Sequence, residues 1–301
     1  MKISVVINTL NEEKNIKRCL ESVHELADEI VICDDGSTDK TVEIAKEFTD
    51  KIFHHQSKGY VEAARNFALS KSKSDWILVI DADEEIPKTL TVKLRGLATS
   101  KKQQAASFVS IPRKNIIFGK WIKHSGWWPD YNVRFFKKGK VVWSEKIHED
   151  PKTAGKSLKL EPEEKLAIVH HNYDSIDQYI SRLNRYTEIE SQILIKEGYK
   201  FDWRDLVSKP TGEFLSRYFA REGYKDDLHG FVLAILQSFS FFVTYLKVWE
   251  KGGFEEKEID VEEVKEEFWE KTKDIRFWFF KVLSESERGI RKLVYKISKR
   301  V

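Results

Sequence analysis

Two carboxylates one residue apart, Asp81 and Asp83, follow directly after the apolar run Ile77–Ile80. Such a run is typical of a buried parallel strand, and open α/β sheets bind ligands beyond the carboxyl ends of their strands. Burying two carboxylates there costs free energy unless a positive group lies beside them. A hydrated divalent cation that carries a diphosphate would supply that positive charge. A solvated acidic turn before Pro87 is the alternative, because this pattern is too short to decide by itself.

Polar side chains also follow two earlier apolar runs of the chain. Asn8 and Thr9 come after the first run, and Asp34 and Asp35 come after the second. Taken alone, the acidic pair could be a turn that caps a helix. Because the carboxyl ends of parallel strands share one edge of a sheet, we expect all four residues to lie near Asp81. The convergence of three polar strand ends predicts a ligand-binding crevice.

The elements that must position these residues alternate between strands and helices. This alternation predicts an α/β fold with a mostly parallel sheet flanked by helices. We expect the first helix to be capped near Asn11 and the third to begin at Gly59, with short strands and aromatic loops between Phe108 and Pro151. The strands expected in the parallel sheet are Ile3–Ile7, Glu29–Cys33, Lys51–His54 and Trp76–Ile80.

The pattern changes to helical beyond Ser175, so we expect one domain over residues 1–174 and a helical region over 175–301. The apolar stretch Phe231–Leu246 is interrupted by polar residues and is shorter than the roughly 20 residues of a spanning helix, which favours a buried or interfacial helix. Aromatic and basic residues mix at the end of the chain. That composition suits a helix on an anionic membrane face, or one packed on the catalytic domain.

Composition excludes several classes of protein. The 301 residues carry a net charge of +3 with both signs mixed, which gives no broad footprint for nucleic acid. Cys19 and Cys33 cannot build a disulfide framework or a zinc site of their own, so a reducing cytoplasm is expected. The chain contains no G-x-x-x-x-G-K, H-E-x-x-H or C-x-x-C pattern, which removes the common phosphotransferase, zinc-protease and thioredoxin-like interpretations.

Four motifs, in order and at suitable spacing, resemble those of family-2 glycosyltransferases of the GT-A fold. They are Ser4–Glu13, Glu29–Thr41, Ala64–Asn66 and Asp81–Asp83, and they cover roughly the first half of the chain. Enzymes of this family transfer sugars from nucleotide-activated donors with inversion. The loop Gly126–Phe136 and the later Lys146–Glu149 extend the resemblance toward the lipopolysaccharide core glucosyltransferases that extend an inner-core heptose.

The resemblance implies roles for the donor-side residues. It places Asn8, Thr9 and Asp35 around the nucleotide base and ribose, where a carboxylate can accept hydrogen bonds from ring N–H or hydroxyl donors. Arg65 would add a positive group beside the diphosphate. A surface arginine paired with Glu62 is the alternative for Arg65.

The resemblance also implies a metal site. Asp83 would ligate Mg²⁺ or Mn²⁺ directly, and Asp81 would hold the ribose or a metal-bound water. The cation would neutralise the charge that develops on the departing nucleotide diphosphate. His148 matches the histidine of the family's His-Glu pair and could bind the metal or donate to the leaving group, with His170 and His171 as rivals for that role.

Inversion requires a base on the face of the sugar opposite the diphosphate, and Asp130 is the candidate. It follows the aromatic loop that contains Trp127 and Trp128, whose apolar walls could raise the pKa of the carboxyl group toward neutral pH. The same loop could stack on the acceptor sugar, although buried tryptophans are also common in ordinary cores. Arg134 and Glu149 are further candidates for contacts with the acceptor.

Together these observations predict a metal-dependent inverting hexosyltransferase with a nucleotide-diphospho-sugar donor, a UDP-sugar above all. The expected acceptor is a glycan or glycolipid of the lipopolysaccharide-core type. A polyprenyl-phosphate or peptide acceptor and a non-catalytic nucleotide-sugar-binding protein are the alternatives. The expected location is the cytoplasm, with peripheral contact at the inner face of the membrane, and nucleic acid is not an expected partner.

Overall fold

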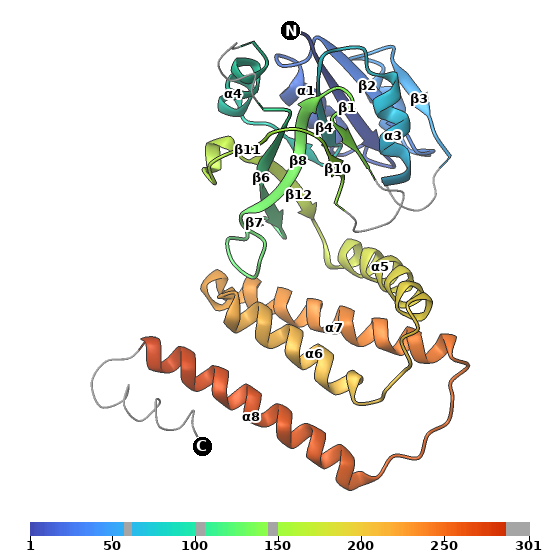
Figure 1. The fold of residues 1–301 in the computed structure, drawn as a ribbon, viewed down its shortest axis with the longest axis vertical. Helices are drawn as coiled ribbons and strands as arrows, with labels where there is room; N and C mark the ends of the chain where they lie inside the picture. The colour runs from blue at the N-terminus through green and yellow to red at the C-terminus, as the bar shows by residue number, and fades with distance from the viewer. Residues whose placement is uncertain (57–61, 100–105, 144–149, 287–301) are drawn as a thin grey trace. The chain divides into compact units, whose positions relative to one another are not determined.

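The computed structural model describes residues 1–56, 62–99, 106–143 and 150–286 (Figure 1). The chain divides into two compact units, which we call the sheet unit (residues 1–117 and 128–172) and the helical unit (residues 118–127 and 173–301). The prediction of a first domain over residues 1–174 therefore differs at 118–127. This segment belongs to the helical unit because the amides of Lys123 and His124 donate to the Asp226 carboxylate.

Four parallel strands form one half of the main sheet, in the order β3-β2-β1-β4. The sequence predicted β2, β3 and β4 to within one residue at either end and β1 to within two, and the residues of β1 and β4 are almost all buried. A continuous apolar run suits a strand that is covered on both faces. Their bounds are β1 (Ile3–Thr9), β2 (Glu29–Asp34), β3 (Ile52–His54) and β4 (Trp76–Asp81).

The other half of the sheet follows in the order β8-β6-β12-β5, with β8 antiparallel to β4. The prediction of short strands and loops after Phe108 is wrong here, because β6 has ten residues and β8 has eight. The sheet is therefore mixed rather than mostly parallel. This half contains β5 (Glu84–Glu85), β6 (Phe108–Ile117), β8 (Asp130–Lys137) and β12 (Ile168–Tyr173), and β11 (Ser157–Lys159) and β7 (Lys120–Trp121) pair with β6. Separately, β9 (Val141–Val142) pairs with β10 (Lys152–Thr153).

Helices cover the sheet. The first begins at Ile16, with Asn15 at its N-cap position, and not near Asn11 as predicted. Asn11 instead has a positive φ of 54°, and its Oδ1 accepts the backbone N–H of Thr38, so it holds the loop before the helix. Gly59 lies outside the described residues. The helices of this unit are α1 (Ile16–Val23), α2 (Thr41–Ala45), α3 (Glu62–Lys71) and α4 (Lys88–Thr99), with a short 3-10 turn, η1, at Glu164–Leu166.

The core lies on both faces of the sheet because side chains alternate along each strand. Val5 and Ile7 of β1 pack in the cluster that contains α1 and α4. Val6, between them, packs in the cluster that contains α3. Trp76 of β4 stacks on Phe135 of β8, with ring centroids 4.6 Å apart, which joins the parallel half to the antiparallel half.

The helical unit confirms the prediction of helices beyond Ser175 for the part of the chain that is described. Ser175 caps the first of them, its hydroxyl oxygen accepting the backbone N–H of Gln178. In Figure 1, α6 lies between α7 and α8. The unit contains β7 (Lys120–Trp121), α5 (Ile176–Lys196), α6 (Asp205–Leu215), a π turn η2 (Ser216–Ala220), a 3-10 turn η3 (Gly223–Asp226), α7 (Asp227–Lys251) and α8 (Val261–Ser286).

Helix α7 extends the predicted apolar helix in both directions. The segment 223–251 has a mean hydropathy of 1.7 in its most apolar window, of which 28% is buried, and it is long and apolar enough to cross a membrane. The expectation that this helix is too short for a span is therefore wrong. The core helix of a soluble protein passes the same test, so length and composition do not decide its environment.

Candidate active site

The three polar strand ends meet at one edge of the sheet, as predicted. In the parallel register Asn8 of β1 lies between Cys33 of β2 and Asp81 of β4. The next residue, Thr9, lies opposite Asp34. The apolar runs are the reason, since they place each strand in the core and bring each polar residue to the same edge.

Asn8 and Thr9 bring polar atoms to this edge that are buried and unsatisfied. Both residues are only 4% exposed. Neither amide atom of the Asn8 side chain, nor the Thr9 hydroxyl, has a hydrogen-bond partner among the residues described. Buried polar groups are nearly always paired, so unpaired ones call for an explanation. A ligand with both donors and acceptors would satisfy them.

At the end of β2, Asp34 holds the turn that follows. Its carboxylate accepts the backbone N–H groups of Gly36 and Ser37 at 3.1 to 3.2 Å, and Gly36 has a φ of 98° that favours glycine. Asp35 is free of this turn, and burial raises the pKa of its carboxyl group. The Asp34 carboxylate is therefore used to hold the turn, while the Asp35 carboxylate is better placed to bind a ligand.

Two histidines, His54 and His55, also reach these carboxylates. His54 Nδ1 lies 3.1 Å from Asp34, and His55 Nδ1 lies 3.1 Å from Asp35. His54 is the last residue of β3, whose parallel pairing with β2 brings it to the same edge. Both histidines could have been singled out from the sequence, because His54 ends the predicted strand Lys51–His54 and His55 follows it.

Asp81 is bracketed by two buried arginines. Arg65 Nη2 donates to its two oxygens at 2.9 and 3.1 Å, and Arg134 Nη2 donates at 2.7 Å. Burial opposes ionisation, but Arg134 and then Arg65 hold the pKa of the Asp81 carboxyl group far below its usual range. The alternative of Arg65 as a surface arginine is therefore wrong. Arg134, expected to contact the acceptor, is instead bound to the carboxylates of Asp81 and Glu84.

Glu84 is a residue of this cluster that the sequence did not single out. It is fully buried, and its Oε1 accepts from Arg134 at 2.8 Å and from Arg113 at 3.2 Å. Its Oε2 accepts the backbone N–H of Asp81 at 2.9 Å. The four acidic residues within 81–85 could have indicated such a cluster from the sequence, because carboxylates buried together require positive side chains from elsewhere in the chain.

Asp130 begins β8, directly opposite Arg113 of β6. Arg113 Nε and Nη2 lie 2.7 and 2.6 Å from Asp130 Oδ2, and Asn115 Nδ2 lies 3.2 Å from the same oxygen. Burial raises the pKa of the Asp130 carboxyl group, but Arg113, Asn115 and His170 together outweigh burial, so the net shift is downward. The expectation that apolar walls raise this pKa is wrong, because the cross-strand partner is a cation. The role of Asp130 as base stays a prediction.

Asp83 lies beside His170, with 3.4 Å between Oδ2 and Nε2. The amide of Asn115 donates to Asp130, which turns its Oδ1 toward His170 Nδ1 at 2.7 Å. Nδ1 must then carry the proton, so a neutral His170 points the lone pair of Nε2 at a carboxylate. Two acceptors facing each other fit a site for a cation. The Asp83 carboxylate, completed by phosphate and water oxygens, suits Mn²⁺ or Mg²⁺, and the imidazole favours a transition metal such as Mn²⁺ over Mg²⁺.

The rivals of His170 are placed differently. The His171 ring lies 3.2 Å from Glu85, and only its backbone N–H reaches the Asp83 carbonyl. His148 and Glu149 lie outside the described residues. Within the described residues no group of three or more His, Cys, Asp or Glu side chains is arranged to hold a metal alone.

The two tryptophans of the aromatic loop belong to different units. Trp127 lies in the helical unit, where its backbone N–H donates to the His124 carbonyl at 3.0 Å. Trp128 lies in the sheet unit and is joined to Pro129 by a cis peptide bond. Their contact with an acceptor stays a prediction.

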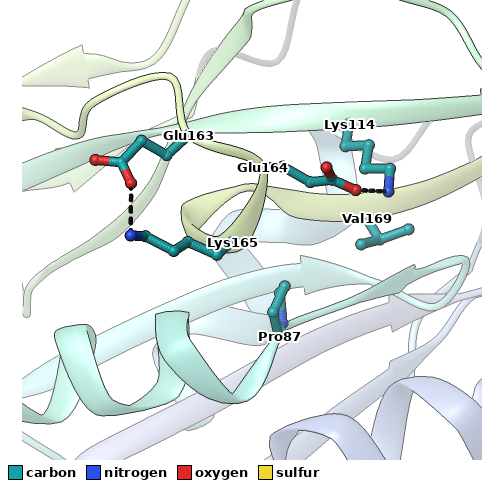
Figure 2. Close-up of a pocket in the computed structure, with 6 residues that line it drawn as sticks. All are labelled: Pro87, Lys114, Glu163, Glu164, Lys165 and Val169. Carbon is teal, nitrogen blue, oxygen red and sulfur yellow. Dashed lines mark hydrogen bonds and ion pairs between the residues drawn. The ribbon is translucent and has the colours of Figure 1, made fainter.

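A pocket of about 540 Å³ in the sheet unit is not this site (Figure 2). Its charged residues neutralise one another, since Lys114 pairs with Glu164 and Lys165 pairs with Glu163. Residues already paired in this way offer little to a ligand. The candidate site lies instead at the strand ends.

The family model described as glycosyl transferase family 2 matches residues 4–154, which is half of the chain and includes every strand-end residue described above. The chain belongs to glycosyltransferase family 2. The predictions of a glycosyltransferase and of an α/β fold of the GT-A type with a helical C-terminal region are thereby confirmed.

Similar proteins share this family. An uncharacterized glycosyltransferase of Rickettsia typhi is 30% identical, and the match covers 82% of this chain and 86% of that protein. The lipopolysaccharide core biosynthesis glycosyltransferase LpsC of Rhizobium meliloti is 26% identical, with 83% and 93% covered. Each is similar along most of its length.

Solved structures are matched over a smaller share of their length. TarS of S. aureus is 19% identical with a TM-score of 0.41, covering 65% of this chain and 39% of that one. Glucosyl-3-phosphoglycerate synthase from Mycobacterium tuberculosis, in complex with Mn²⁺ and UDP-glucose, is 25% identical with a TM-score of 0.32, covering 39% and 44%. The chain thus spans less than half of either solved structure.

The ion cluster predicts a large stability effect for Arg134→Met. The substitution leaves Asp81 and Glu84 buried with less compensating charge, so we expect the free energy of unfolding at pH 7 to fall by about 3–5 kcal/mol in urea. The folded-state pKa of Asp81 is lowered from an ordinary value of 3.8. Its stabilising contribution is therefore complete above that pH and is lost as the pH falls below it, and the difference between variant and wild type should narrow there.

Arg95→Met is the matched control. Arg95 pairs with Asp28 at 2.6 Å, but both side chains are about one-third exposed. An exposed pair contributes about 1 kcal/mol or less. Equal losses in the two variants would contradict the importance of the buried cluster.

Proposed function

We propose that this chain is an inverting hexosyltransferase that uses a nucleotide-diphospho-sugar, a UDP-sugar above all, with Mg²⁺ or Mn²⁺. Its acceptor is a glycan or glycolipid of the lipopolysaccharide-core type. The observation that carries the proposal is the sheet edge where the unsatisfied Asn8 and Thr9 lie beside Asp81 and its two arginines. The similarity to LpsC over 93% of that protein's length supports the class of acceptor.

Donor binding uses groups that the fold leaves unsatisfied. The Asn8 amide can donate and accept at once, as can the Thr9 hydroxyl, which suits a base edge and a ribose. The Asp35 carboxylate can accept a ring N–H, and His55 at 3.1 Å orients it. Arg65 and Arg134 supply positive charge beside the expected place of the diphosphate. The Nε of each is buried without a partner within the described part of the chain.

Asp83 and His170 would hold the cation. When bound, it supplies charge neutralisation for the departing nucleotide diphosphate. Asn115 fixes the His170 tautomer through its bond at Nδ1, as the outer partner of a metal ligand usually does.

Asp130 is the proposed base. The acceptor hydroxyl oxygen attacks the anomeric carbon, the bond to the diphosphate oxygen breaks, and the hydroxyl proton passes to the Asp130 carboxylate. Its lowered pKa keeps it ionised at neutral pH. Such a carboxylate is a weak base at rest, but it can take a proton that becomes acidic in the transition state.

Asp130→Asn should lose turnover by about 10²–10⁴-fold while UDP binding in the presence of Mn²⁺ stays close to that of the wild type. The amide keeps the shape of the side chain but cannot accept the proton. Turnover is measured as UDP release from UDP-glucose with a heptose-terminated core oligosaccharide as acceptor. Full activity in this variant would refute the assignment of the base.

Asp83→Ala should abolish both turnover and the Mn²⁺-dependent part of UDP binding, measured as thermal stabilisation by UDP and other nucleotides with and without the metal. Asp75→Ala is the matched control, since this exposed aspartate precedes β4 at the end opposite Asp83. Mn²⁺-dependent stabilisation that survives in Asp83→Ala would show that the metal site lies elsewhere.

A lipid-linked acceptor would bring the helical unit to a membrane. Leu228, Phe231, Ile235 and Phe239 on α7 are exposed, and their spacing of three and four residues puts them on one stripe. Of the aromatic and basic tail proposed from the sequence for the same contact, residues 275–283 lie in α8 and residues 288–300 lie outside the described residues. The stripe is the better defined candidate because a bilayer would cover its apolar surface.

Vesicle flotation tests this contact. The wild-type chain should float with vesicles that contain anionic lipid, and the double variant Phe231→Glu/Phe239→Glu should lose most of that binding, because two charges on the stripe oppose insertion. Val92→Glu replaces a residue that is 73% exposed on α4 and serves as the control. Failure of the wild-type chain to float with anionic vesicles at low salt would contradict the proposed membrane contact.

A further inference from the structure

Arg113 joins the two ends of the ion cluster. Its Nη1 lies 3.2 Å from Glu84 Oε1, while its Nε and Nη2 lie 2.7 and 2.6 Å from Asp130 Oδ2. All three guanidinium nitrogens therefore contact carboxylates. Glu84 in turn binds Arg134 and the backbone N–H of Asp81. A chain of direct contacts runs from the donor edge to the proposed base.

The two oxygens of Asp130 are not equivalent. Oδ2 accepts from Arg113 twice and from Asn115. Oδ1 accepts from Asn132 at 3.2 Å. A carboxylate oxygen has about two lone-pair sites, so Oδ2 is fully engaged while Oδ1 keeps a position for another donor. The Asp130 side chain is 27% exposed, which leaves it within reach of a substrate.

We infer that Arg113 is a positioning residue of the transfer reaction: it clamps Oδ2 of Asp130 so that Oδ1 is presented to the acceptor hydroxyl, and through Glu84 it sets that oxygen relative to the donor edge. The inference rests on the proposed role of Asp130 as base. Arg113 itself touches neither substrate. Its fork, anchored on a fully buried carboxylate, cannot follow a rotation of the Asp130 carboxylate without breaking its contact with Glu84.

The surroundings of Asp130 make Arg113 the dominant charge. Arg113 on β6 and His170 on β12 act electrostatically on Asp130, as does Arg134 on β8, while Glu84 on β5 contacts Arg113. Arg113 is the one of these that lies within hydrogen-bond distance of Asp130 in the contacts given above. Loss of the Arg113 charge should raise the pKa of the Asp130 carboxyl group. Loss of the two contacts from Nε and Nη2 should allow the carboxylate to rotate.

Two substitutions separate charge from geometry. Arg113→Gln removes both, so kcat should fall by about 10- to 100-fold and the acid limb of the pH profile should move to higher pH. Arg113→Lys keeps the charge without the bidentate fork, so the pH profile should stay close to that of the wild type while kcat remains reduced. The KM for UDP-glucose should change less than about twofold in both, since Arg113 does not touch the donor.

Lys114→Gln is the matched control. Lys114 neighbours Arg113 on β6 but pairs with Glu164 in the pocket of Figure 2, so its loss should leave kcat and the pH profile unchanged. Thermal unfolding and UDP binding with Mn²⁺ check that each variant is folded. Wild-type kcat and pH profile in folded Arg113→Gln would overturn the inference, and so would a pH profile shifted equally in Arg113→Lys.

An NMR titration of Asp130, which requires no turnover, tests this inference independently of the proposed function. In the full chain labelled with ¹³Cγ-aspartate, the Asp130 resonance is assigned by its absence in Asp130→Asn. Its titration should move to higher pH in Arg113→Gln and not in Lys114→Gln. If the wild type transfers no sugar, the proposed function fails, whereas the titration still shows whether Arg113 controls Asp130. An unchanged Asp130 titration in Arg113→Gln would overturn the inference even in an active enzyme.

Discussion

The constraint on which the site depends is charge balance inside the sheet. Asp81, Glu84 and Asp130 are drawn out of water by a fold that buries the strand ends, and an isolated buried carboxylate would protonate or unfold the chain. Three arginines from different elements prevent this: Arg65 from α3, Arg113 from β6 and Arg134 from β8. Arg134 of the antiparallel half therefore helps to keep Asp81 of the parallel half ionised, while Arg113 and Arg134 balance Glu84 and Asp130 within their own half.

This dependence explains what the sequence could and could not predict. The strands β1, β2 and β4 are continuous apolar runs, and the parallel arrangement follows from the helices between them, so the meeting of Asn8, Asp34 and Asp81 was predictable. Local loop conformation was not. Asn11 looked like a helix cap, but it adopts a positive φ because its side chain is held by a loop 27 residues away.

The sequence also did not predict which residues face each other across neighbouring antiparallel strands. The pKa of Asp130 depends on which residue faces it, and Arg113 carries no motif that announces this pairing. The register of β6 and β8 supplies it. The same holds for His170, which lies opposite Glu84 in the pairing of β12 with β5 and so comes beside Asp83. Residue types predicted the kinds of chemistry, while the antiparallel register determined the partners.

The unsatisfied side chains of β1 have a consequence for evolution and engineering. Apolar residues of similar size in place of Asn8 and Thr9 would remove buried polar groups that have no hydrogen-bond partner among the described residues, and would extend the apolar run of β1. Selection for heat resistance alone would favour such changes. Their presence indicates that the strand end is maintained by something other than the stability of the empty protein. A library ranked by melting temperature would discard the residues proposed to bind the donor.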